Sequence, residues 1–70
     1  MIIINETVCR RIAHYRDKRN LTREELASNV GIKLKRLIDI ETGLRIPRIN
    51  ELVQLATGLC ISIDELVNNE

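Results

Sequence analysis

Residues 21–43, LTREELASNVGIKLKRLIDIETG, decide the fold of this chain, because they hold two helical patterns separated by a glycine. Thr22 and Glu25 have the spacing of a capping box, in which each side chain accepts a hydrogen bond from the backbone N–H of the other residue. A helix over about residues 22–30 follows. Gly31 ends it, because a left-handed backbone angle is easily reached only without a Cβ atom.

The second pattern predicts a helix over about residues 33–42, which Gly43 ends in the same way. Its predicted inward-facing residues are Leu37, Ile40 and Glu41. Its predicted outward-facing residues are Lys35, Arg36 and Asp39. Two short helices joined by a tight turn are typical of a DNA-binding motif in which the second helix enters the major groove.

Three further helices complete the prediction. One covers about residues 6–18 with Asn5 as its N-cap, and another covers about residues 48–57 and ends at Gly58. A second capping box at residues 62–65 opens a last short helix. The chain is therefore expected to be one compact all-α domain of five helices.

The first four residues, Met-Ile-Ile-Ile, are apolar and prone to β structure. They are compatible with two arrangements. Ile4 packs over the first helix as a hydrophobic staple, or the segment forms an edge strand that pairs with its copy in a second subunit.

The formal net charge is only +1, but charge is unevenly distributed along the sequence. Residues 10–48 contain all eleven Lys and Arg residues and five of the ten acids, whereas the flanking segments are acidic. This asymmetry favours a basic face that meets phosphate, with the acidic remainder turned away from it. Scattered solubilising charge is the alternative interpretation.

Several function classes find little support in the composition. The single aromatic residue, Tyr15, makes binding of single strands by base stacking an unlikely function. Cys9, Cys60 and His14 fit no metal-ligand spacing, and both cysteines are expected to be buried thiols. No signal core, membrane-length apolar run or catalytic residue set is evident, so we expect a cytoplasmic protein that is not an enzyme and holds no cofactor.

The pattern of residues resembles the Cro/C1-type (XRE-family) helix-turn-helix repressors over about residues 8–67. The matching positions are Leu21-Thr-x-x-Glu-Leu-Ala-x-x-Val-Gly-Ile, Leu37-x-x-Ile-Glu-x-Gly, Pro47, and Leu52-x-x-Leu-Ala-x-Gly-Leu-x-Ile-Ser-x-Asp-Glu-Leu. The resemblance implies the compact five-helix fold of the lambda-repressor-like DNA-binding domains. It also implies that Arg16, on the first helix, pairs with Glu41 and orients the recognition helix.

The resemblance further implies which residues would contact DNA. The base-reading candidates are Leu34, Lys35, Arg36 and Asp39, with Lys35 the best candidate for guanine. The phosphate-contact candidates are Thr22, Arg23, Lys33, Arg45 and Arg48.

The start of the recognition helix departs from the family pattern, because Lys33-Leu34 replaces the usual Ser or Thr cap. Leu34 packs on a thymine methyl group in one interpretation, and belongs to a protein-binding surface in the other. Asp39 similarly accepts from cytosine N4, or pairs with Lys35 one turn earlier.

The leading hypothesis is therefore a sequence-specific double-stranded DNA-binding regulator, most simply a repressor, that reads DNA as a homodimer. The dimer surface is expected at the last helix and its preceding loop, or at residues 1–4. No membrane partner or small-molecule ligand is indicated. The alternative is a protein-interaction module on the same fold, with an apolar surface formed by Leu34, Ile38, Leu44 and Ile46.

Overall fold

The computed structural model describes residues 6–67, and in that range it contains five helices and no strand. The helices are α1 (Glu6–Lys18), α2 (Arg23–Val30), α3 (Leu34–Glu41), α4 (Ile49–Leu59) and α5 (Ile63–Val67). The predicted all-α class and five-helix order are confirmed. The predictions for Asn5 and for residues 1–4 lie outside the described residues.

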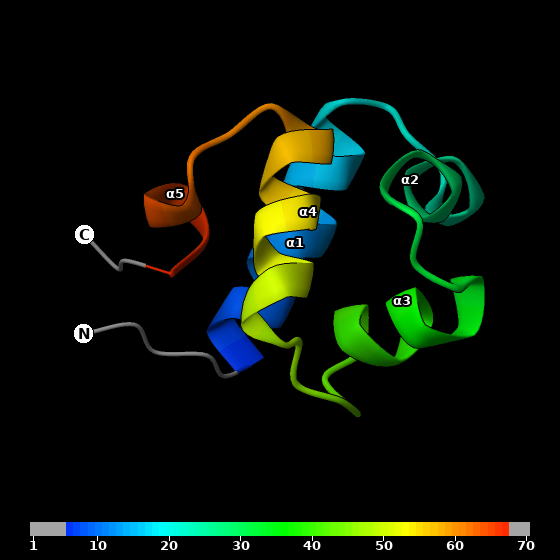
Figure 1. Cartoon of the computed structure of the whole chain (residues 1–70), viewed down its shortest axis with the longest axis horizontal. Helices are drawn as coiled ribbons and strands as arrows, with labels where there is room; N and C mark the ends of the chain where they lie inside the picture. The colour runs from blue at the N-terminus through cyan, green and yellow to red at the C-terminus, as the bar shows by residue number, and fades with distance from the viewer. Residues whose placement is uncertain (1–5, 68–70) are drawn as a thin grey trace.

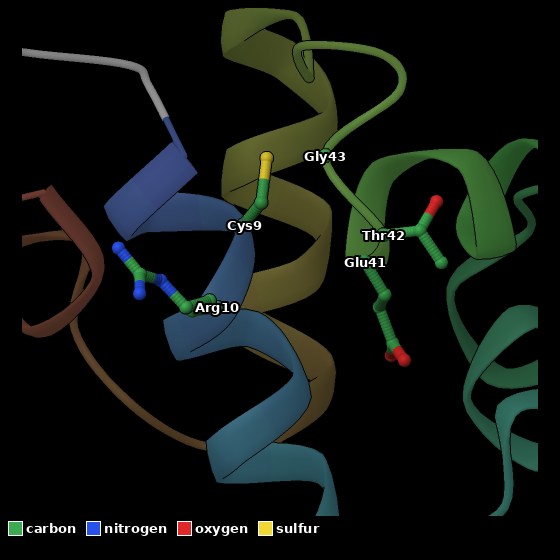
Figure 2. Close-up of a pocket in the computed structure, with 5 residues that line it drawn as sticks. All are labelled: Cys9, Arg10, Glu41, Thr42 and Gly43. Carbon is green, nitrogen blue, oxygen red and sulfur yellow. The ribbon is translucent and has the colours of Figure 1, made fainter.

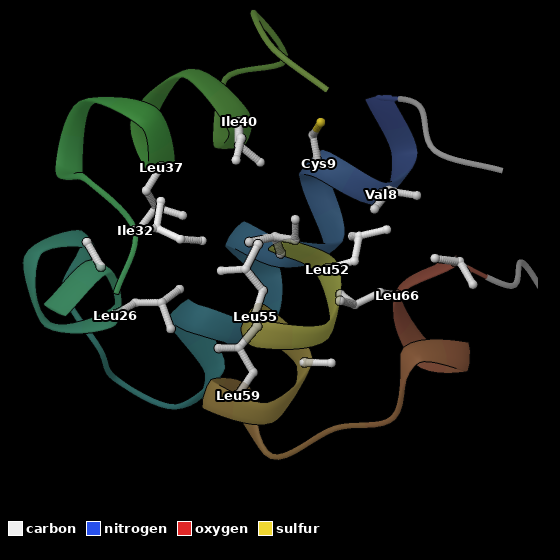
Figure 3. Close-up of a cluster of buried hydrophobic side chains, with 14 residues drawn as sticks. Val8, Cys9, Leu26, Ile32, Leu37, Ile40, Leu52, Leu55, Leu59 and Leu66 are labelled. Carbon is white, nitrogen blue, oxygen red and sulfur yellow. The ribbon is translucent and has the colours of Figure 1, made fainter. Parts of the chain in front are cut away.

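Helix α4 lies in front of α1 at the centre of the molecule, with α2 and α3 to one side and α5 to the other (Figure 1). The side chains between these helices form one aliphatic core (Figure 3). Ile12, Leu26, Leu37, Leu55 and Leu66 are each fully buried within it. Leucine and isoleucine thus supply the apolar area that aromatic residues supply in many small domains.

The turn between α2 and α3 has the predicted geometry. The Glu25 N–H donates to Thr22 Oγ1 at 3.0 Å, and the Thr22 N–H donates to Glu25 Oε1 at 2.8 Å. Gly31 has φ 75°, in the left-handed region, and its N–H donates to the Ala27 carbonyl. Ile32, the next residue, is buried. It anchors the turn to the core just before α3 begins.

Helix α3 is one residue shorter at each end than predicted. Lys33 is its N-cap and makes no side-chain cap hydrogen bond, and Thr42 is its C-cap. The Thr42 hydroxyl donates to the Ile38 carbonyl at 2.9 Å. Gly43 then has φ 84°, so the chain does turn at the predicted glycine, one residue beyond the cap.

The predicted end of α4 at Gly58 is wrong. The helix continues to Leu59, and Cys60 adopts the left-handed C-cap conformation at φ 58°. Gly58 instead lies where α4 approaches α2, and a Cβ atom at this position would overlap Val30 Cγ1. The glycine is required by close helix packing and not by a turn.

Cys60 is exposed, which corrects the prediction that both cysteines are buried, whereas Cys9 is in the core. The predicted capping box of α5 is present, since the Ser62 N–H donates to Glu65 Oε2 at 3.0 Å and the Glu65 N–H donates to Ser62 Oγ at 3.3 Å. Leu66 is buried as expected, and Ile63 is only partly buried.

Candidate nucleic-acid interface

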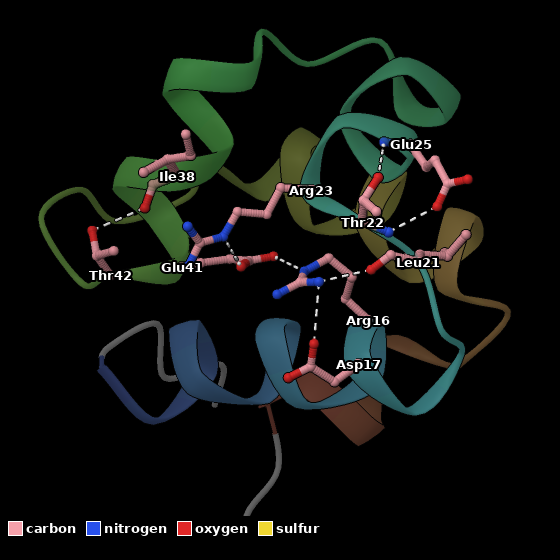
Figure 4. A network of polar contacts seen from close by, with 9 residues as sticks. All are labelled: Arg16, Asp17, Leu21, Thr22, Arg23, Glu25, Ile38, Glu41 and Thr42. Carbon is pink, nitrogen blue, oxygen red and sulfur yellow. Dashed lines mark hydrogen bonds and ion pairs between the residues drawn. The ribbon is translucent and has the colours of Figure 1, made fainter.

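The Glu41 carboxylate joins three helices at the inner side of α3 (Figure 4). Its side chain is fully buried, and it accepts from Arg16 Nε of α1 at 2.8 Å and from Arg23 Nε of α2 at 2.9 Å. Arg16 also donates to the Leu21 carbonyl at 2.7 Å. The hydrogen bond to Glu41 raises the pKa of Arg16, which keeps the guanidinium charged. The ion pair that the resemblance implied is thus present in the structure, with Arg23 as a second partner.

A second buried carboxylate fixes α3 to α4. Glu51 accepts from Arg36 Nε at 3.0 Å and from Arg36 Nη2 at 2.9 Å, and its Oε1 also accepts from the Arg48 N–H at 2.7 Å. The bidentate contact with Arg36 lowers the pKa of the Glu51 carboxyl. Two paired parallel N–H donors are the strong geometry for a guanidinium and a carboxylate.

Arg36 therefore does not point outward as predicted from the sequence. Its side chain is half-buried and turned toward the start of α4. The periodicity of α3 alone could not reveal this, because the partner lies fifteen residues later on a different helix. We assign Arg36 a role in holding α3 in place.

The acidic residues of α3 and α4 are the less exposed charges of this region, and Asp39, predicted to face outward, has a side chain that is only 15% exposed and pairs with Lys35. Asp39 is only partly exposed, while Glu41 and Glu51 are buried. The exposed charged residues from the start of α3 to the start of α4 are all basic, and they are Lys33, Lys35, Arg45 and Arg48. The solvent-facing side of this region is therefore electropositive, although the chain as a whole is nearly neutral.

The first turn of α3 carries the most accessible of these side chains. Lys35 is 86% exposed and lies 3.5 Å from Asp39 Oδ2, so the intrahelical pair is present in this structure. Leu34 beside it is 37% exposed, and Ile38 is half-buried. Two apolar side chains of α3 are therefore at least partly open to solvent.

The two phosphate candidates at the start of α2 have internal hydrogen-bond partners. Thr22 Oγ1 accepts the Glu25 N–H as the helix cap. Arg23 Nε donates to the Glu41 carboxylate, and the Arg23 side chain remains 41% exposed. Arg23 is thus oriented by the same carboxylate that positions α3, which the sequence analysis missed because nothing local indicates the contact.

A groove of about 320 Å³ runs between the start of α3 and the outer side of α4. Its lining includes the predicted Lys33 and Arg48 together with Asn50 and Gln54, two exposed amides that the sequence analysis did not single out. Amides beside cations are suitable for contacts to phosphate and to base edges.

A smaller hollow of about 210 Å³ lies between α1 and the end of α3 (Figure 2). Cys9 and Arg10 line it from α1, and Glu41, Thr42 and Gly43 line it from α3 and its end. Glu41 is already bound to two guanidinium groups, so its carboxylate is not available as a base here.

Residues 6–67 contain no group of three or more His, Cys, Asp or Glu side chains placed to bind a metal ion. Within the same residues, no helix has the length and apolar character needed to span a membrane.

Comparisons with known proteins match this chain to helix-turn-helix proteins. The family model described as Helix-turn-helix, HTH_3, matches residues 12–66. The chain is 39% identical over 56 residues to the cryptic phage CTXphi transcriptional repressor RstR of Vibrio cholerae, covering 80% of this chain and 50% of that protein. The chain thus spans about half the length of this curated relative.

Two solved structures are similar over most of the chain. The biofilm regulator SinR in complex with DNA matches with a TM-score of 0.81 and 30% identity, over 84% of this chain and 95% of the SinR chain in that structure. The restriction-modification controller protein C.AhdI of Aeromonas hydrophila matches with a TM-score of 0.83 and 28% identity, over 86% of this chain and 91% of that one.

Proposed function

The chain belongs to the helix-turn-helix family HTH_3, and from that premise we propose that it is a sequence-specific double-stranded DNA-binding repressor that acts as a homodimer. The observation that carries this proposal is the outward side of α3 and the following loop, where every exposed charged residue is basic, Glu41 and Glu51 are buried, and Asp39 is only partly exposed. Counterion release from phosphate would then supply most of the affinity.

The proposed recognition surface is the first turn of α3. Lys35 would donate to guanine O6 and N7 in the major groove, and Leu34 would contact a thymine methyl group. Asp39 would hold Lys35 in the absence of DNA and accept from cytosine N4 when Lys35 moves to its base.

The remaining exposed cations would fix the domain on the duplex. Phosphate contacts would come from Lys33, Arg45 and Arg48, and from the part of Arg23 that Glu41 leaves exposed. Thr22 would contribute through its position at the positive end of α2 and through its O–H, which stays free to donate to phosphate while its oxygen accepts the capping N–H.

The size of the domain supports a dimer. Its longest dimension is 30 Å, whereas successive major-groove faces of a duplex are about 34 Å apart. One copy therefore reaches a single half-site, and two copies are needed for a palindromic target.

Relatives include a phage transcriptional repressor, which is the reason to propose repression as the output. A DNA target also agrees with the cytoplasmic location expected from the sequence.

Selection of binding sites from random duplex DNA tests this function directly. We expect a palindromic motif, and an affinity that falls steeply with salt because several phosphates are neutralised. Lys35→Ala should reduce discrimination at one position of each half-site by about 1–3 kcal/mol. Arg45→Ala should weaken binding to all sequences equally and reduce the salt slope by about one. Flat salt dependence with no selected motif would refute the proposal.

One observation favours a second candidate function, a protein-interaction module. Leu34, Leu44 and Ile46 are all at least partly exposed near the outward face of α3. Leu34→Asp discriminates the two, because it should lower affinity mainly for sites with thymine at one position if α3 reads DNA. Loss of a stable protein complex with unchanged DNA selectivity would favour the second function.

A further inference from the structure

The loop that connects α3 to α4, residues 42–48, projects beyond both helices at one end of the molecule (Figure 1). Leu44 lies in this loop and is 69% exposed, more than any other large apolar side chain of the described residues. Ile46, two residues later, is 47% exposed, and Arg45 between them is exposed as well. Two apolar side chains thus flank a cation on the surface of the loop.

The backbone of this loop is held by side chains of other elements. The Arg45 carbonyl accepts from Cys9 Sγ of α1 at 3.8 Å. The Ile46 carbonyl accepts from Arg36 Nη2 of α3 at 3.4 Å. Leu44 is therefore exposed on a segment with a fixed position, where folding alone gives its side chain little to contact.

We propose that Leu44 packs against a deoxyribose of the bound DNA strand, beside the phosphate that Arg45 contacts, and that Ile46 packs against the neighbouring sugar. A DNA strand alternates anionic phosphates with largely apolar sugar carbons, which matches an arginine between two aliphatic side chains. This assignment rests on the proposed function and adds to it a contact that involves no charge and no base.

The charges around the loop favour this occupant. All exposed charged residues between positions 33 and 48 are basic, so the surroundings of Leu44 attract a polyanion. A protein segment that covered Leu44 would have to be apolar and acidic at the same place. The sugar-phosphate backbone has both properties in every nucleotide.

A leucine on a sugar has consequences that a cation on a phosphate does not. It releases no counterion and reads no base edge, so its contribution is independent of salt and of sequence. It also distinguishes deoxyribose from ribose. The 2′-hydroxyl of a ribose would be buried against the leucine without a hydrogen-bond partner, which is unfavourable.

Replacing Leu44 by serine tests the contact. The variant should fold normally, because the side chain is mostly exposed. It should bind the selected duplex about fivefold more weakly, since part of a leucine side chain no longer leaves water. The slope of affinity on salt and the selected motif should both stay unchanged.

Fluorescence anisotropy with labelled duplex over a range of salt concentrations measures the affinity, and far-UV circular dichroism verifies folding. Val53→Ser is the matched control, because Val53 is an aliphatic residue that is 50% exposed on α4, outside the loop. This control should bind DNA as tightly as the unmodified chain.

A second measurement uses duplexes that carry one ribonucleotide at successive positions of the selected site. The unmodified chain should bind more weakly when the ribonucleotide occupies one particular position of each half-site. In Leu44→Ser this effect should disappear, since serine can donate to or accept from the 2′-hydroxyl. A role of Leu44 in folding alone would not produce this dependence on the sugar.

Leu44 does not contact a sugar if Leu44→Ser binds as tightly as the unmodified chain, if its salt slope falls as in Arg45→Ala, or if both proteins respond equally to every ribonucleotide. In these cases the unmodified chain still selects a motif, so the proposed function stands. Both fail if the unmodified chain binds no duplex. Loss of a protein complex in Leu44→Ser, with unchanged affinity for DNA, would assign the loop to a protein partner instead.

Discussion

Replacing Glu41 by glutamine should destabilise the domain strongly, although the two side chains have almost the same shape. The glutamate is fully buried and accepts from both Arg16 and Arg23. A glutamine could still accept from one guanidinium through its oxygen, but its NH₂ group would face the N–H donors of the other. One of the two arginines would therefore meet another donor, and Arg16 would keep only the exposed Asp17 carboxylate, 3.1 Å away, as its anion.

The size of the effect follows from the exposure of the two arginines. Breaking a buried ion pair by removing one partner costs about 3–5 kcal/mol. Arg23 is 41% exposed and can turn toward water, so its share is small. Arg16 is 12% exposed but retains the Leu21 carbonyl as an acceptor and the exposed Asp17 carboxylate, 3.1 Å from its Nη1, as an anion. We therefore expect Glu41→Gln to lose about 2–3 kcal/mol, which for a domain of this size lowers the melting temperature by roughly 10–20 °C.

Thermal and urea unfolding followed by far-UV circular dichroism measures this loss. Glu24→Gln, the same change at an exposed residue of α2, is the control and should stay within about 0.5 kcal/mol of the unmodified chain. If Glu41→Gln lost no more than Glu24→Gln, the buried carboxylate would not be what holds α3 against α1 and α2.

Three further predictions concern other parts of the structure. Gly58→Ala should cost about 1–2 kcal/mol, because overpacking against Val30 exceeds the gain in helix propensity, and this loss should vanish when measured in a Val30→Ala background. The lowered pKa of Glu51 contributes stability that is fully present above pH 4.5 and lost as the pH falls through the folded-state pKa, so acid titration of the melting temperature should show a fall below pH 4.5. Cys60 should react with a thiol reagent in the native protein, whereas Cys9 should react only at the rate of unfolding.

Much of the fold was predictable from the sequence, because its signals are local. The capping boxes at Thr22 and Ser62 and the left-handed Gly31 depend on residues within four positions of one another. The helix periodicities likewise predict which side chains face the core. Such features need no knowledge of how the helices are arranged.

The wrong predictions concern residues whose role depends on a segment distant in the sequence. Gly58 was predicted to be a cap because glycine commonly ends helices. In the structure a glycine fits this position because α2 approaches α4 there. Arg36 was predicted to face DNA because the helix alone leaves it outward, but Glu51 of α4 holds it. The resemblance supplied the pairing of Arg16 with Glu41, which sequence spacing alone does not.

The outward positions at the start of α3 contribute little to the folded structure. Lys33 makes no side-chain cap hydrogen bond, Lys35 is 86% exposed and pairs only within its own helix, and Leu34 is partly exposed. The contacts that seat α3 come instead from residues on its other side, Glu41 and Arg36. Substitutions in this first turn can therefore accumulate without loss of folding, so the proposed recognition surface can change its target sequence while the scaffold stays the same.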